Sequence, residues 1–133
     1  MPGSGDAQPL CSWDRRNVVK CVIVDDNESF LAAAIDLLAR GGVDVVGTAS
    51  NSADAIRLVE ELQPDVTLVD VNLGGEDGLE LARELGAASK VILVSTLAEE
   101  DLAELIAASP AIGFVSKARL SEQAIRELLQ RAA

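Results

Sequence analysis

The stretch PDVTLVDVNLGGEDGLEL, residues 64–81, contains the pattern that decides the fold. Its residues 65–70 form a short run dominated by apolar and β-branched side chains, which predicts a buried strand ending at Asp70. Residues 72–78 carry three glycines and predict a loop. Leu79, Ala82 and Leu85 then recur at helical spacing. Strand, loop and helix in this order indicate one unit of an alternating α/β domain.

The same alternation extends in both directions from this stretch. Apolar runs predict strands at residues 18–24, 43–48, 65–70, 90–94 and 111–115. Between and after them, apolar periodicity predicts helices at residues 28–40, 52–62, about 79–85, 98–108 and 120–131. Gly41-Gly42, Pro64 and Pro110 are expected to end helices, and Ser52 to cap one.

The helical stripes also predict which side chains face the core. The expected inward residues are Phe30, Leu31, Ala34, Ile35, Leu38, Ile56, Val59, Leu62, Leu102, Leu105, Ile106, Ile125, Leu128 and Leu129. The strands are continuously apolar, which is typical of a sheet buried on both faces. Five strands alternating with five helices therefore predict an α/β fold with a parallel sheet and right-handed crossovers.

Length and composition limit the possible functions. The 133 residues suit one domain, and a net charge of −11 argues against a nucleic acid partner. The acidity is explained either by solubility or by a cation site. With no histidine, most zinc chemistry and every Ser-His or Cys-His nucleophile are excluded. Cys11 and Cys21 form no CxxC pair and are expected to be reduced thiols.

Composition also indicates how the chain begins and where in the cell it is located. Residues 1–17 are rich in Pro, Gly and polar side chains, which predicts a flexible extension before a domain at residues 18–133. No apolar run approaches the roughly 20 residues that a bilayer requires, and no secretory signal is present. We therefore expect a cytoplasmic protein with no membrane partner.

Polar residues gather where the predicted strands end. They are Asp25-Asp26-Asn27, Asp70 with Asn72, Ser95-Thr96 and Ser116-Lys117. In parallel α/β sheets, ligands bind outside the carboxyl ends of the strands. Three carboxylates at this edge would repel one another unless a divalent cation joined them. Mg²⁺ prefers such oxygen ligands together with substrate phosphate.

The chemistry that this set favours is phosphoryl transfer to a carboxylate. A metal ion and Lys117 would neutralise the transferred group. Each residue also has a structural explanation when taken alone. Asp25 and Asp26, or Ser95 and Thr96, could cap the helices that follow them, Asp70 could be a solvated loop carboxylate, and Lys117 could be a surface lysine. The joint arrangement at four strand ends is more specific than any one of them.

Four stretches together resemble the receiver domain of two-component response regulators: CVIVDDNESF, PDVTLVDVNLGGEDGLEL, VILVST and GFVSKA. The resemblance runs from about Lys20 to Arg131. It implies a flavodoxin-like doubly wound sheet of the (βα)5 type with strand order 2-1-3-4-5. It also implies a signalling phosphoacceptor domain rather than an enzyme acting on a separate substrate.

The resemblance implies a role for each matching residue. Asp70 matches the phosphoacceptor, and Asp25 and Asp26 match the acidic pair that holds Mg²⁺, with Mn²⁺ as an alternative. Asn72 sits where the family uses a backbone carbonyl as a metal ligand, so the implied metal ligands are Asp25, Asp26, Asp70 and Asn72. Lys117 matches the lysine that pairs with the phosphoacceptor or the phosphoryl group. Ser95 matches the switch hydroxyl and Phe114 the switch aromatic, although Phe114 is equally well explained as a core residue of its strand.

Three positions depart from the commonest family pattern. Lys117 is followed by Ala118 rather than Pro, and a cis peptide there would cost about 3 kcal/mol. Ser95 stands where Thr is common, and Phe114 lacks the hydroxyl of the usual Tyr. None of these changes removes the phosphorylation chemistry.

The implied partners are a histidine kinase or phosphotransfer protein, a downstream protein or fused effector domain, and a phosphorylation-dependent second copy. Two other hypotheses remain at this point. One is a pseudo-receiver that binds partners without phosphorylation. The other is a haloacid dehalogenase-like phosphatase, which would need an acid where Asn72 stands.

Overall fold

The computed structural model describes residues 18–97 and 99–132, so the extension expected at residues 1–17 lies outside the described residues. The strands are β1 (Val19–Val24), β2 (Val43–Ala49), β3 (Val66–Asp70), β4 (Asn72–Leu73), β5 (Glu76–Asp77), β6 (Lys90–Ser95) and β7 (Gly113–Ser116). The helices are α2 (Glu28–Arg40), α3 (Ser52–Leu62), α4 (Gly78–Leu85), α5 (Glu99–Ala107), α6 (Glu122–Ala132) and the 3-10 turn η1 (Lys117–Arg119). Most predicted bounds differ from these by one or two residues.

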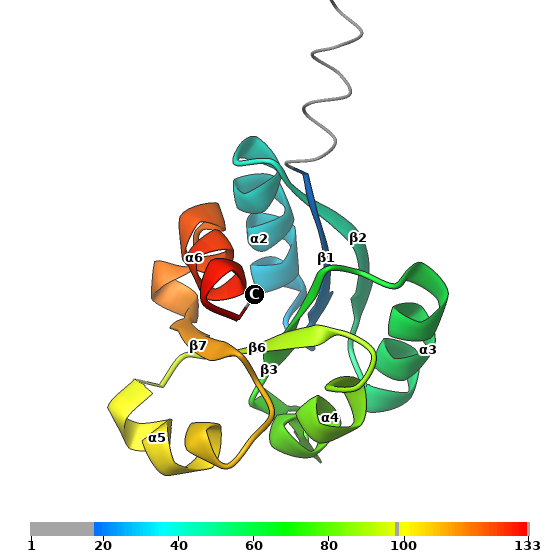
Figure 1. The fold of residues 1–133 in the computed structure, drawn as a ribbon. Helices are drawn as coiled ribbons and strands as arrows, with labels where there is room; N and C mark the ends of the chain where they lie inside the picture. Colours follow the sequence, from blue (N-terminus) through cyan, green and yellow to red (C-terminus); the bar gives the residue numbers. More distant parts are fainter. Residues whose placement is uncertain (1–17, 98, 133) are drawn as a thin grey trace, which may run out of the picture.

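The main sheet has five parallel strands in the order β2-β1-β3-β6-β7. Numbered along the chain, these strands follow the expected order 2-1-3-4-5, which confirms the flavodoxin-like arrangement (Figure 1). The order reverses between β1 and β3, and open α/β sheets bind ligands at such a switch point. Among the described residues, no helix is long and apolar enough to cross a bilayer.

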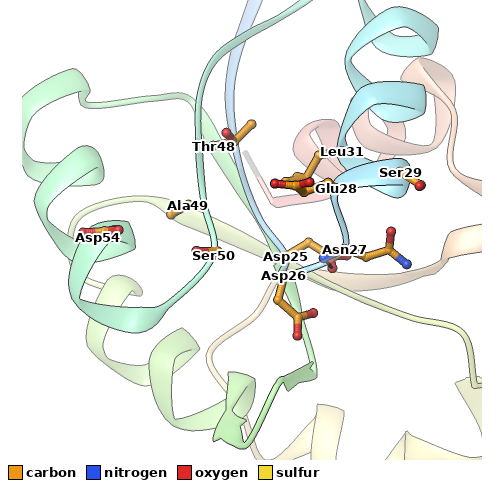
Figure 2. A pocket seen from close by; sticks show the side chains of 10 residues that line it. All are labelled: Asp25, Asp26, Asn27, Glu28, Ser29, Leu31, Thr48, Ala49, Ser50 and Asp54. Carbon is orange, nitrogen blue, oxygen red and sulfur yellow. Dashed lines mark hydrogen bonds between the residues drawn. The ribbon is translucent and has the colours of Figure 1, made fainter.

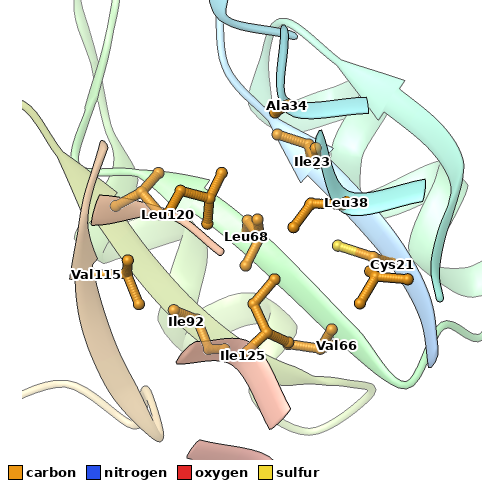
Figure 3. Packing of buried hydrophobic residues seen from close by; sticks show 12 residues of the cluster. Cys21, Ile23, Ala34, Leu38, Val66, Leu68, Ile92, Val115, Leu120 and Ile125 are labelled. Atoms are coloured by element: carbon orange, nitrogen blue, oxygen red, sulfur yellow. The ribbon is translucent and has the colours of Figure 1, made fainter. Parts of the chain in front are cut away.

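Alternate residues of the central strands supply two separate cores. Cys21 and Ile23 of β1 pack with α2 and α6 on one face of the sheet, as Figure 3 shows. Val22 and Val24 pack with α3 and α4 on the other face. Because a strand points successive side chains to opposite faces, burial on both faces requires the continuous apolar runs seen in the sequence.

Three residues predicted to face the core are exposed. They are Ile35 at 40%, Leu62 at 37% and Leu105 at 50%. Buried neighbours such as Ala34 and Leu38 show which face of α2 meets the sheet. A helix covers a sheet with a stripe narrower than its full apolar arc, so residues at the edge of that arc remain in contact with solvent. The prediction of inward orientation was wrong for these three.

The cap of α3 was also predicted incorrectly. Asn51, rather than Ser52, precedes the helix with extended backbone, and its side chain accepts a hydrogen bond from the Asp54 amide. Asn is as good an N-cap as Ser, and Ser52 is the first residue of the helix. Ser52 donates its amide instead to Glu76 Oε1 at 2.9 Å.

The segment predicted as a loop contains a small antiparallel hairpin. β4 and β5 pair Asn72 with Asp77 and Leu73 with Glu76 around the turn at Gly74-Gly75. Both glycines have positive φ, 51° and 103°, a backbone region that favours glycine. The prediction missed the hairpin because two-residue strands have no detectable periodicity.

Candidate functional site

Three carboxylates meet at the carboxyl edge of the main sheet. Asp25 and Asp26 follow β1, and Asp70 is the last residue of β3. One carboxylate oxygen from each lies within 4.8 Å of the others. Asp25 is fully buried, Asp70 is 6% exposed and Asp26 is exposed. The pairing of β1 with β3 brings together residues 45 positions apart in the chain.

Lys117, the first residue of η1 directly after β7, contacts two of these carboxylates. Its Nζ lies 2.6 Å from Asp25 Oδ2 and donates a hydrogen bond to Asp70 Oδ2 at 3.1 Å. The lysine side chain is only 13% exposed. Ser116 is the N-cap of η1, and its Oγ accepts a hydrogen bond from the Ala118 amide. This bond holds the backbone of the turn that begins with Lys117. No cis peptide occurs in the described chain, so the Lys117–Ala118 bond is trans.

Burial and neighbouring charges shift the pKa values of Asp70 and Lys117. Burial raises the pKa of Asp70 and the nearby Asp25 adds to it, although the Asn72 amide and Lys117 oppose the shift. For Lys117, burial lowers the pKa, but contacts with Asp25 and Asp70 outweigh burial and raise it. Lys117 therefore stays charged at neutral pH, and the ionised form of Asp70 is less favoured in the folded chain than it would be in water.

The donor set fits a hard divalent cation. Asp25 Oδ2 is buried and has no hydrogen-bond partner with suitable geometry among the described residues; its contact with Lys117 is an ion pair. The other oxygen of Asp25 accepts a hydrogen bond from the Asn27 amide at 2.9 Å. Mg²⁺ uses one or two carboxylates and several waters, which the exposed Asp26 beside the buried Asp25 would allow.

An open pocket of about 780 Å³ adjoins the carboxylates. Figure 2 shows the turn after β1 and the start of α2 facing the end of β2 and Asp54 of α3 across it. Asp25, Asp26, Glu28 and Asp54 line this space. The pocket gives solvent and small molecules access to Asp26, and its acidic lining favours cations.

The resemblance also implied roles for Ser95, Asn72 and Phe114, which the structure places as follows. Ser95 ends β6, one position beyond Val94, which is the register partner of Asp70, and its Oγ accepts a hydrogen bond from the Leu97 amide. Asn72 donates its amide to Asp70 Oδ1 at 3.1 Å. Phe114 is half-buried and packs against the core on the same face of the sheet as α3 and α4.

The alternative that Asp25 and Asp26 merely cap the following helix is wrong, because the N-cap of α2 is Asn27. Its side chain accepts a hydrogen bond from the Phe30 amide. Two further residues lie at the site and were not predicted from the sequence to do so. The Phe30 ring lies against Lys117, and Gly78 lies against the backbone of Asp70. For Gly78, the available signal was the DGL segment at residues 77–79, where the predicted loop meets the predicted helix. Nothing in the local pattern indicated Phe30.

Comparison with known proteins gives one consistent family. The response regulator receiver domain family matches residues 21–130. The response regulator GacA of Pseudomonas aeruginosa is 31% identical over 117 residues, covering 85% of this chain and 55% of that protein. A protein-glutamate methylesterase/protein-glutamine glutaminase of Halobacterium salinarum is 38% identical over 86 residues, covering 63% of this chain and 25% of that protein. The chain thus spans between a quarter and about half of these relatives.

Solved structures agree with the sequence matches. The signal receiver domain of the putative response regulator NarL from Mycobacterium tuberculosis has a TM-score of 0.76 and 28% identity. The match covers 85% of this chain and 97% of that domain. A LuxR-family two-component response regulator from Aurantimonas has a TM-score of 0.75 and 25% identity, covering 86% of each chain.

Proposed function

Because the chain belongs to the response regulator receiver domain family, we propose that it accepts a phosphoryl group on Asp70 and thereby switches a signalling surface. The observation that carries this proposal is the contact of Lys117 Nζ with both Asp70 and Asp25 at the switch point of the sheet. A nucleophilic carboxylate beside a buried cation is what phosphoryl transfer to aspartate requires.

The donor would be a phosphohistidine of a histidine kinase or phosphotransfer protein, or a small acyl phosphate. A carboxylate oxygen of Asp70 attacks phosphorus, an O–P bond forms, and the bond from phosphorus to the donor breaks. The leaving group keeps that electron pair. Lys117 stabilises the charge on the phosphoryl oxygens throughout, since its ammonium already contacts Asp70.

The metal would be held by Asp25, Asp26 and Asp70, with the Asn72 backbone carbonyl as a fourth protein ligand. When bound, Mg²⁺ neutralises the phosphoryl oxygens and helps to align the donor with Asp70. Mn²⁺ is the alternative cation. Asp25 would also orient Lys117 and the turn at Asn27, because its two oxygens contact the Lys117 ammonium and the Asn27 amide.

The response to phosphorylation would use Ser95 and Phe114. The Ser95 hydroxyl, which accepts from the Leu97 amide in this structure, would turn to the phosphoryl group and draw the following loop inward. Phe114 would move into the vacated space. A population shift of this kind changes the surface of α5, β7 and α6. That surface would contact a downstream protein, a fused effector domain or a second copy, in the cytoplasm.

We expect Mg²⁺ to stabilise the folded chain. A ligand that binds only the folded state at about a hundred times its Kd adds about 2.7 kcal/mol to the free energy of unfolding. Urea unfolding with and without Mg²⁺ measures this gain. Asp26→Asn should lose most of it, whereas Asp44→Asn, an exposed residue of β2, should keep it. Equal stabilisation of both variants would contradict the proposed metal site.

The direct test of the proposed function is the intact mass of the chain after incubation with acetyl phosphate. We expect a gain of one phosphoryl group in the presence of Mg²⁺ and no gain with a chelator, because the phosphoryl oxygens would then lack the metal charge. If acetyl phosphate fails, a phosphorylated histidine kinase domain is the second donor. Failure with both donors would leave a pseudo-receiver, an interaction module that works without phosphorylation.

A further inference from the structure

The aromatic ring of Phe30 lies against the ammonium group of Lys117. Nζ is 4.6 Å from the ring centroid, within the distance of about 6 Å at which a cation over a ring face is attracted by the ring quadrupole. Phe30 belongs to the first turn of α2, and Lys117 is the first residue of η1, directly after β7. The two residues are therefore brought together only by the packing of α2 over the sheet.

The backbone of Phe30 is tied to the carboxylate site by two consecutive hydrogen bonds. Its amide donates to Asn27 Oδ1 at 3.1 Å, and the Asn27 amide donates to Asp25 Oδ1 at 2.9 Å. Its side chain also packs on the core between α2 and the sheet. These contacts place the first turn of α2, which carries the ring, beside Asp25, the residue whose other oxygen contacts Lys117.

The ammonium of Lys117 has three neighbours of different character. An ammonium carries three N–H donors and no acceptor. Asp25 Oδ2 and Asp70 Oδ2 are two of its neighbours, and the Phe30 ring is the third. A ring attracts the charge without offering a competing hydrogen-bond acceptor. An aliphatic side chain of similar size would fill the space but would not attract the ammonium.

We propose that Phe30 is a positioning residue whose ring holds the Lys117 ammonium toward Asp70 and so accelerates phosphoryl uptake. The inference rests on the proposed role of Asp70. Phe30 acts through Lys117 and does not touch the phosphoryl donor. It matters most while the negative charge of Asp70 is being transferred to the phosphoryl group, because the ring contact does not depend on that charge.

The test is a series of fluorinated phenylalanines placed at residue 30 by nonsense suppression. One, two and three fluorines progressively weaken the ring quadrupole while changing the ring volume little. We expect the rate of phosphoryl uptake from acetyl phosphate with Mg²⁺ to fall stepwise, by about three- to tenfold with three fluorines. Phe30→Leu should fall at least as far, and Phe30→Tyr should retain most of the rate.

Two controls separate positioning from packing. Urea unfolding identifies any variant that is slow because its fold is damaged. In addition, the ε-methylene protons of Lys117 should show an upfield ring-current shift in the unmodified chain that shrinks along the fluorine series, as the ammonium leaves the weakened ring face. Rates that do not change along the fluorine series, in variants of equal stability, would overturn the proposal.

The proton signals also distinguish failure of this proposal from failure of the proposed function. If the unmodified chain accepts no phosphoryl group from any donor, the role of Asp70 fails. Under that result, an upfield Lys117 signal that shrinks along the fluorine series still supports positioning by the ring. An unshifted Lys117 signal overturns it.

Discussion

Asp70→Asn is expected to take up no phosphoryl group under conditions that load the unmodified chain. The amide retains the shape of the side chain and the hydrogen bond from the Asn72 amide, but it is not a nucleophile. Lys117 keeps its ion pair with Asp25, so the rest of the site should remain assembled. We expect the rate to fall by more than about a hundredfold, the scale on which removing a covalent nucleophile acts.

Intact mass after reaction with acetyl phosphate and Mg²⁺ measures this effect. The matched control is Asp44→Asn, which makes the same chemical change at an exposed site near the amino end of β2. That variant should react like the unmodified chain. Full phosphorylation of Asp70→Asn would show that another residue is the acceptor.

Asp70→Asn should also be more stable than the unmodified chain at neutral pH in the absence of metal. The pKa of Asp70 is raised by burial, so the folded chain binds this proton more tightly than the unfolded chain does. Its contribution to the free energy of unfolding therefore falls as pH rises from the unfolded pKa, near 4, through the folded pKa. Asn removes that loss. Urea unfolding at pH 7 and at pH 3 should show the advantage only at pH 7.

Gly78→Ala is expected to destabilise the fold by about 3 kcal/mol or to prevent its assembly. A Cβ atom at this position would lie 2.0 Å from the carbonyl oxygen of Asp70 and 2.9 Å from Val71 Cα. Both are backbone atoms, and the Gly78 amide also donates to the Val71 carbonyl at 3.0 Å. The clash can be relieved only by moving α4 away from the strand end that carries Asp70.

Urea unfolding measures the loss, with Gly86→Ala as the control. Gly86 ends the same helix with φ −58°, and an added Cβ would lie 3.2 Å from Pro110 Cγ and 3.3 Å from the Ala82 carbonyl oxygen, contacts that shifts of a few tenths of an ångström relieve. We expect the control to change stability by less than about 1 kcal/mol. Equal stability of Gly78→Ala and the unmodified chain would show that α4 is not held against Asp70.

The prediction of the strands and of the carboxylate edge succeeded for a specific reason. Residues 21–24 of β1 are fully buried and alternate between the two cores, so the first carboxylate after them, Asp25, stands where the strand ends. Asp70 and Ser95 likewise occupy the last positions of β3 and β6. Because parallel strands align their carboxyl ends, a one-dimensional list of strand ends already predicts a three-dimensional cluster.

Periodicity was less informative about the edges of the packed elements. Ile35 and Leu105 have the spacing of core residues, yet 40% and 50% of their surfaces are exposed. Whether a side chain at the edge of a helical stripe is buried depends on the neighbouring elements that cover it, and sequence spacing contains no information about them. The hairpin of β4 and β5 was missed because its strands are too short to show a period.

The sequence by itself determined the α/β alternation, the order of the elements and the set of residues at the carboxyl edge of the sheet. These depend on burial patterns within single segments, which local composition encodes. Only the tertiary structure decided that Lys117 contacts Asp25 as well as Asp70, that Phe30 lies against its ammonium, and that Gly78 touches the Asp70 carbonyl. Each of these contacts joins segments that are separate in the chain, and its distance is set by how helices and loops pack on the sheet rather than by any local preference.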